Sequence, residues 1–370
     1  MRKRQFVVGC LSTLFYLGLY TGFYLFAPAA AAEQWHAVVL QYRHVGDAAP
    51  AATSISVNGL QRQLRYLRDN RYTVLPLPEL VQRLRSGQSL PERSVAISFD
   101  GANRSVCETA FPLLNELKIP FTIFVNVDAI DKNSPANCTW DQLRALAAAG
   151  VTLANHTVNH SHLIYRGDQP TGNWRAQILA EIEDGEQRIL ERPGQSHRLL
   201  AWPHGEFNEA TKQLARDAGY VAFGQQSGPL GRDSDWLELP RFPMSGEAGL
   251  ITNLPAFGAK LQTLPFPIEA VHAPDIPLTI EGGIPSLELV LRANRGGRRP
   301  LRTQLQCFSA DGKRISSHWL SETRFRVKAY RALPLGHASY NCTLPAGSGR
   351  FYWYSHAWIT ADTNGRWPDR

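Results

Sequence analysis

The sequence predicts an α/β domain with a parallel sheet or barrel, followed by a smaller antiparallel β domain. Between about residues 36 and 265, short apolar runs alternate with segments of helical periodicity, as in repeated strand–helix units. Prolines then interrupt this pattern, and after residue 278 only strand-like segments follow. With 370 residues, of which 44% are hydrophobic and 19% charged, the chain is long and apolar enough to bury a sizeable core.

The first 32 residues are predicted to direct export. Three basic residues at positions 2–4 precede an uncharged run over residues 6–26, and small residues lead up to Ala32. This order is typical of a signal peptide cleaved near Ala32, and the run is also long enough for an uncleaved membrane anchor. Removing this segment takes away three basic and no acidic residues, so the net charge falls from +7 to +4. A chain of that charge with scattered Lys and Arg gives no reason to expect a nucleic-acid partner.

The strands and helices of the α/β domain, residues 33–265, follow from local patterns. Leu60, Leu64 and Leu67 lie on one face of a predicted helix. A second helix begins at a capping box over residues 139–142, and a third begins after Asn208. The predicted strands are 37–42, 95–99, 121–125, 151–154 and 199–202.

A Pro-rich linker is predicted over residues 266–277 and a small antiparallel β-sandwich over residues 278–370. Its expected strands are 287–291, 302–308, 325–330 and 351–354, with a hairpin turn at Asp311-Gly312. Its many aromatic residues are interpreted mainly as core, with a sugar-stacking surface as the alternative.

Four cysteines remain after export, in a compartment that is expected to be oxidising. Cys307 and Cys342 both lie in the β-rich tail and are the favoured pair. Cys107–Cys138 is a second candidate, and four buried thiols are the alternative.

Three polar motifs follow predicted strands, where ligand chemistry gathers in α/β folds. Asp100 ends the run SFDG, and His156 and His160 lie four residues apart in HTVNH, a spacing that lets two imidazoles share a metal ion. The third motif, WPHG around His204, is a turn whose backbone N–H groups could stabilise an oxyanion.

The three motifs in this order resemble the polysaccharide deacetylases of the NodB-homology type, carbohydrate esterase family 4, over about residues 37–265. The opening LQYRHVG and the segment Leu239-Pro240-Arg241 are most similar to the exported branch that acts on poly-N-acetylglucosamine. The resemblance implies a distorted (β/α) barrel and removal of N-acetyl groups from an acetylated polysaccharide. It also implies a divalent metal, zinc first, with cobalt and nickel as alternatives.

Residue by residue, the resemblance makes Asp100 the general base and His156 and His160 the metal ligands. The peptide N–H of His204 would be the oxyanion donor, and Arg241 would orient the base.

Two positions depart from the family pattern. Gly101 stands where a third metal ligand, an aspartate, is expected, and Arg43 stands where a proton-donating histidine is expected. His44, one residue later, is the substitute acid considered first, with His272 as another candidate, and Glu206 or water could complete the metal shell. The main prediction is therefore a metal-dependent hydrolase that removes N-acetyl groups and is impaired by Gly101 and Arg43. A non-catalytic glycan-binding or export-assisting protein is the alternative, and an O-acetyl esterase ranks below both.

Overall fold

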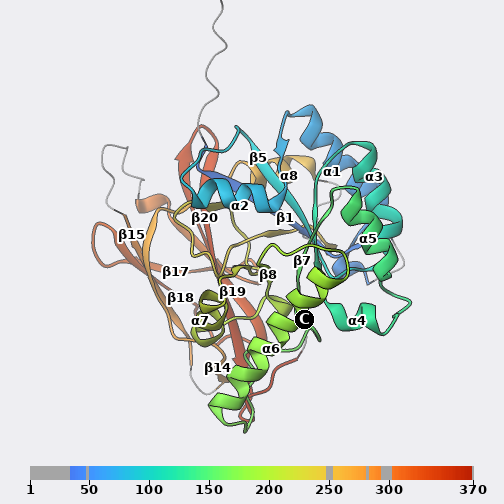
Figure 1. Cartoon of the computed structure of the whole chain (residues 1–370). Coiled ribbons are helices and arrows are strands. Elements are labelled where there is room, and N and C mark those ends of the chain that lie inside the picture. The colour runs from blue at the N-terminus through green and yellow to red at the C-terminus, as the bar shows by residue number, and fades with distance from the viewer. Residues whose placement is uncertain (1–33, 47–49, 247–252, 281–282, 293–301, 369–370) are drawn as a thin grey trace, which may run out of the picture. The chain divides into compact units, whose positions relative to one another are not determined.

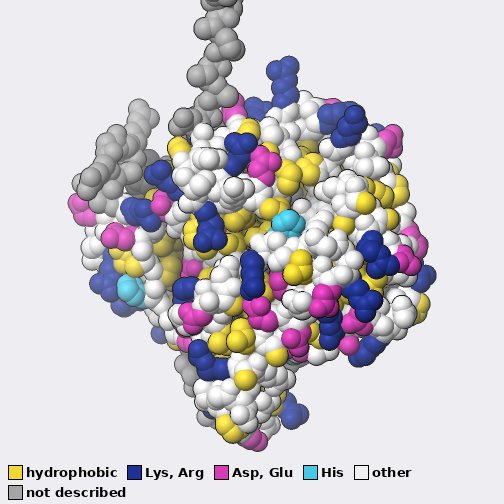
Figure 2. All heavy atoms as spheres, in the orientation of Figure 1, with side chains coloured by type: hydrophobic (Ala, Val, Ile, Leu, Met, Phe, Trp, Pro, Cys, Tyr) yellow, Lys and Arg dark blue, Asp and Glu magenta, His cyan; other side chains and the backbone are white. Residues whose placement is uncertain are grey.

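The computed structural model describes residues 34–46, 50–246, 253–280, 283–292 and 302–368. The predicted export segment, including the apolar run over residues 6–26, lies outside these residues. Within the described ranges, no helix combines the length and apolar character that crossing a bilayer requires. Figure 2 shows basic and acidic side chains interspersed over one face, so the positive charge is spread there rather than concentrated.

The first sheet confirms the predicted α/β class. Its strand order is β10-β1-β5-β6-β7-β8-β9, with β4 beside β5 and β11 beside β1. All pairs are parallel except β1 with β10. The order leaves β9 and β10 at its two ends, so the sheet is a distorted half-barrel. The strands are β1 (His36–Tyr42), β4 (Thr73–Val74), β5 (Ser94–Asp100), β6 (Thr122–Val125), β7 (Thr152–Asn155), β8 (Leu199–Ala201), β9 (Val221–Phe223), β10 (Leu230–Gly231) and β11 (Phe242–Pro243).

Helices cover this sheet, and Figure 1 shows α1, α3 and α5 gathered on one side of it. Leu60, Leu64 and Leu67 of α1 are buried, and both predicted capping residues, Thr139 and Asn208, form complete capping boxes. The helices are α1 (Val57–Asp69), α2 (Leu77–Arg85), α3 (Phe111–Glu116), α4 (Val127–Asp131), α5 (Trp140–Ala148), α6 (Thr171–Glu191), α7 (Glu209–Asp217) and α8 (Leu254–Leu261). Two short strands, β2 (His44–Val45) and β3 (Ser54–Ile55), form a separate parallel pair.

The second sheet is a curled, mostly antiparallel sheet around its own core. Its order is β12-β20-β19-β16-β17-β18-β15-β13, with β14 beside β20. Tyr340 and Trp358 are fully buried in its core cluster, as the interpretation of the aromatic residues expected, and Asp311-Gly312 forms the β16–β17 turn. The strands are β12 (Leu264–Pro265), β13 (Ile268–His272), β14 (Leu278–Thr279), β15 (Ser286–Leu291), β16 (Gln306–Ser309), β17 (Arg314–Trp319), β18 (Arg324–Lys328), β19 (Gly336–Gly347) and β20 (Arg350–Ala361).

Part of the Pro-rich stretch 266–277 is ordered as a strand rather than as a connection alone. Strand β13 pairs antiparallel with β15, and His272 lies opposite Glu288. His272 lines a cavity with Glu288, Arg324 and Arg326 on the second sheet. It is therefore not a proton donor for the motifs of the first sheet.

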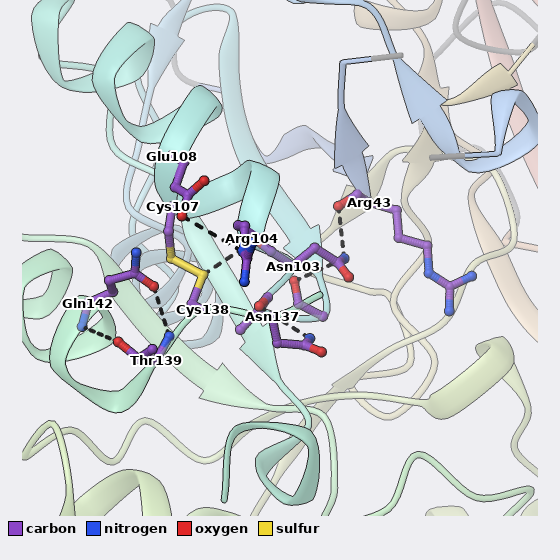
Figure 3. The surroundings of a disulfide bond; sticks show 11 residues. Arg43, Asn103, Arg104, Cys107, Glu108, Asn137, Cys138, Thr139 and Gln142 are labelled. Atoms are coloured by element: carbon purple, nitrogen blue, oxygen red, sulfur yellow. Dashed lines mark hydrogen bonds and ion pairs between the residues drawn. A yellow bond between two sulfur atoms is a disulfide. The ribbon is translucent and has the colours of Figure 1, made fainter. Parts of the chain in front are cut away.

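Both candidate disulfides form, Cys107–Cys138 and Cys307–Cys342. The first joins the short π-helix Val106–Ala110, which follows β5, to the start of α5. Backbone hydrogen bonds from Arg104 to Ala136 and from Cys138 to Ala102 tie the same two segments together. Figure 3 shows the disulfide beside Asn103 and Asn137. The loop after Asp100 is thus anchored on the side of α5.

Replacing both cysteines of either disulfide with alanine should lower the free energy of unfolding by about 3 to 4 kcal/mol. The two bridges close loops with sequence separations of 31 and 35 residues, and chain entropy depends weakly on loop length. Urea unfolding of the two double variants against the unaltered chain measures both losses. Losses that differ by more than about 2 kcal/mol would contradict the entropic account.

Candidate active site

The three polar motifs meet at one edge of the first sheet because β5, β7 and β8 run parallel in it, with β6 between β5 and β7. Asp100 is the last residue of β5, His156 directly follows β7, and Trp202 directly follows β8. The carboxyl ends of parallel strands lie at the same edge, where open α/β folds hold their ligands.

Asp100 is buried and held from two sides. Arg241 donates two hydrogen bonds to it, from Nη1 to Oδ1 at 2.6 Å and from Nη2 to Oδ2 at 2.8 Å, and Gln41 Nε2 donates to Oδ2 at 2.5 Å. Burial acts to raise the pKa of Asp100, but the charge and hydrogen bonds of Arg241, together with the charge of Arg43, outweigh it, so the pKa lies below its ordinary value. Asp100 is therefore an oriented carboxylate at neutral pH.

His156 and His160 present two unused imidazole nitrogens. The Nδ1 of His156 lies 2.8 Å from the carbonyl oxygen of Ala201, and since a carbonyl only accepts, Nδ1 carries the proton and Nε2 a lone pair. The ring centroids are 4.6 Å apart. Within the described part of the chain, the Nε2 atoms of both residues are buried and have no hydrogen-bond partner. Two such nitrogens are suited to bind one metal ion.

Both imidazoles are neutral at physiological pH. Burial lowers the pKa of His156 to about 4, although Asp100 acts in the opposite direction. Burial also lowers the pKa of His160 far below its ordinary value, and the neighbouring His156 and His204 add to this effect. A metal ion would therefore meet deprotonated ligands without displacing protons.

Gly185 of α6 makes room for the loop that follows β7 and carries His156, His160 and His162, here called the histidine loop. A Cβ atom at position 185 would lie 2.8 Å from Asn155 Oδ1 and 3.2 Å from the backbone carbon of Thr157. The Oδ1 of Asn155 accepts the N–H of Thr157 at 2.8 Å, and Asn155 Nδ2 donates to the carbonyl of Ile182. The glycine thus lets α6 pack directly on the loop that carries both histidines.

His204 lies in a turn with unusual backbone angles. His204 has φ 56° and Gly205 has φ 74°, a region that residues with side chains seldom occupy. The His204 ring lies 4.3 Å from that of His160 and 4.1 Å from that of His162, the latter stacked at 12°. His204 Nε2 lies 3.1 Å from the carbonyl oxygen of His160. The side chain of His204 thus brings the turn into contact with the histidine loop.

Arg43 belongs to the site, although its position indicated only a missing acid. Its positive charge acts on Asp100, His156 and His160, and it lowers the pKa of each. Its carbonyl accepts from Asn103 Nδ2 at 3.1 Å, and Figure 3 shows its side chain extending on the side away from the disulfide. The position at the end of β1, next to β5, is the signal that could have placed Arg43 here.

His44 follows in β2 and is half-buried. Burial and the charge of Arg43 lower its pKa. His44 stays a predicted proton donor. It directly follows Arg43, whose charge acts on Asp100 and both histidines.

Position 101 does not supply the third metal ligand. Gly101 has φ 79° and no side chain, and in the described ranges no cluster of three or more His, Cys, Asp or Glu residues has the arrangement of a metal site. Glu206 does not fill the gap, because its oxygens accept hydrogen bonds from His162 and Trp367, and His337 Nε2 lies 2.8 Å from Oε1. This corrects the expectation that Glu206 could enter the metal shell. The residues present fit a metal ion as a two-histidine site.

The α/β domain is similar to known polysaccharide deacetylases. The family model described as polysaccharide deacetylase matches residues 87–223. YxkH of Bacillus subtilis is 25% identical over 206 residues, which cover 55% of this chain and 69% of its own. The poly-beta-1,6-N-acetyl-D-glucosamine N-deacetylase of Staphylococcus aureus is 23% identical over 207 residues, 53% of this chain and 69% of its own.

Among solved structures, the Streptococcus pyogenes deacetylase PplD in complex with acetate has a TM-score of 0.52 at 22% identity. The match covers 59% of this chain and 97% of that chain. At this identity the likeness demonstrates the shared fold of the first domain.

Proposed function

Since this chain belongs to the polysaccharide deacetylase family, we propose that it is a metal-dependent hydrolase that removes N-acetyl groups from an N-acetylhexosamine polysaccharide. One observation carries the proposal. The Asp100 carboxylate, ionised and fixed by Arg241, acts electrostatically on His156, and the Nε2 atoms of His156 and His160 are both buried and unbonded. This combination of an oriented base and paired neutral imidazoles is suited to hydrolysis with metal-activated water.

Each residue has a defined part in this proposal. His156 and His160 would hold the divalent ion, zinc or alternatively cobalt or nickel, which supplies a water of lowered pKa and polarises the amide carbonyl. Asp100 takes the proton of the attacking water, and Arg241 keeps the carboxylate ionised and oriented. The peptide N–H of His204 would donate a hydrogen bond to the developing oxyanion. His44 would protonate the departing amine.

Gly101 and Arg43 weaken this site. Without a carboxylate at position 101, the protein supplies two neutral ligands, and the guanidinium charge of Arg43 acts on both of them. The positive charge of Arg43 close to the two histidines opposes the approach of a metal cation. The same observation favours the second candidate, a glycan-binding or export-assisting protein without turnover.

The two disulfides are typical of a protein outside the cytoplasm. We place the mature chain in the periplasm or the cell envelope, exported by residues 1–32 and either released or held by residues 6–26.

Acetate release from acetylated glucosamine oligomers tests the proposal. The mature chain, residues 33–370, is incubated with zinc, cobalt or nickel, and we expect slow release that Asp100→Asn abolishes. Acetylated xylan in a parallel reaction separates the O-acetyl esterase alternative. If a folded chain released no acetate with any metal but still bound the oligomers, the glycan-binding alternative would replace the enzyme.

A further inference from the structure

Glu206 is a fully buried carboxylate directly after the turn that contains His204. Its Oε2 accepts from His162 Nδ1 at 2.8 Å, and its Oε1 accepts from Trp367 Nε1 at 2.7 Å. His337 Nε2 lies 2.8 Å from the same Oε1. These groups outweigh burial and lower the pKa of Glu206 to about 2, so it is a charge held by donors on both of its oxygens.

Two of these three partners come from the C-terminal β domain. His337 is the second residue of β19, and Trp367 lies near the C-terminus, beyond β20. The Trp367 ring also packs edge-on against His162 at 5.5 Å and Tyr165 at 6.1 Å. The second domain therefore contacts the turn and the histidine loop together.

From Glu206, contacts continue into the site. The ring of His162 stacks on that of His204, and the ring of His204 contacts that of His160, while its Nε2 lies 3.1 Å from the His160 carbonyl oxygen. His160 and His204 both have positive φ, 55° and 56°. Backbone in this region persists when its surroundings over-determine it. The bonds to Glu206 supply such a constraint directly beside the turn.

We propose that His337 and Trp367 are positioning residues of the active site. They fix Glu206, and Glu206 in turn fixes the His204 turn and, through His162, the His160 imidazole. The C-terminal β domain is thus a structural part of the deacetylase site. This inference rests on the proposed function for its effect on rate, but the geometry it describes can be measured without any turnover.

The test compares Trp367→Phe with Trp353→Phe in the mature chain. Trp353 also reaches from the second sheet to the first domain, where its Nε1 donates to the carbonyl oxygen of Ser227 at 3.0 Å and its ring packs on Phe242, away from Glu206. Both substitutions remove one indole donor across the same two domains. A purely structural role predicts similar effects from both.

We expect Trp367→Phe to shift the imidazole NMR signals of His160, His162 and His204, and Trp353→Phe to leave them in place. In acetate release, Trp367→Phe should lower kcat about tenfold with little change in KM, because it displaces the His204 turn and the His160 imidazole rather than the bound glycan. If both variants left the three imidazole signals in place, or moved them equally, the inference would be overturned.

The NMR comparison remains decisive even if the unaltered chain releases no acetate, a result that would count against the proposed function alone. If Trp367→Phe does not fold, His337→Gln removes the other contact from the second sheet. The same shifts would support the inference, and unmoved signals would overturn it.

Discussion

Replacing Gly101 with aspartate should tighten zinc binding to the mature chain by at least about tenfold. His156 and His160 offer two nitrogen ligands, and position 101 directly follows the base at the end of β5. A carboxylate there would complete a three-ligand site and add a negative charge beside Arg43. Even partners that only orient a metal ligand change affinity by about 10- to 100-fold, so a ligand itself should do no less.

Gly101→Asp has a structural cost, and a control variant can reproduce that cost without the charge. At φ 79° any side chain is strained, and a Cβ atom would lie 3.0 Å from Asn103 Nδ2, although Asp and Asn tolerate positive φ better than most residues. Gly101→Asn has the same shape and the same backbone cost without the charge. Calorimetric titration of both variants with zinc isolates the carboxylate, and equal affinities would show that position 101 does not face the ion.

The elements that could be predicted depend on local patterns. Short segments of sequence indicate the buried strands, both helix caps and the polar residues after β5, β7 and β8. Parallel pairing then brings those strand ends to one edge of the sheet. The antiparallel tail also followed from strand-like runs. Strand β13 was missed because prolines at positions 265, 267, 274 and 277 interrupt the surrounding pattern.

The parts that could not be predicted depend on contacts between distant segments. Trp367 is 161 residues from Glu206, and nothing near either residue indicates their pairing. Arg43 was interpreted only as the loss of an acid, because the motif says which residue is missing and not what its replacement does. Its effect on Asp100 and both histidines needs the three-dimensional arrangement.

Replacing Arg241 with methionine should destabilise the metal-free chain by about 3 to 5 kcal/mol at pH 7.5. Arg241 and Asp100 are both fully buried and bonded through two parallel contacts. Removing one partner leaves an uncompensated buried charge, which costs about that much. Asp100→Asn together with Arg241→Met removes the charge as well and should recover most of the loss. Arg188→Met breaks the half-exposed pair with Asp131 and should cost less than about 1 kcal/mol.

The loss should also depend on pH, with a definite sign. In the unaltered chain the pKa of Asp100 is lowered, so its contribution is fully present above the unfolded pKa of about 3.9 and constant from pH 4.5 to 7.5. Without Arg241, burial dominates and raises the folded pKa of Asp100, so the folded variant binds a proton that the unfolded chain releases. The variant therefore loses stability as pH rises towards that raised pKa. Urea unfolding in EDTA should show a larger gap between the two proteins at pH 7.5 than at pH 4.5, and a gap that stays constant, or that matches Arg188→Met, would mean that Arg241 is not what keeps Asp100 ionised.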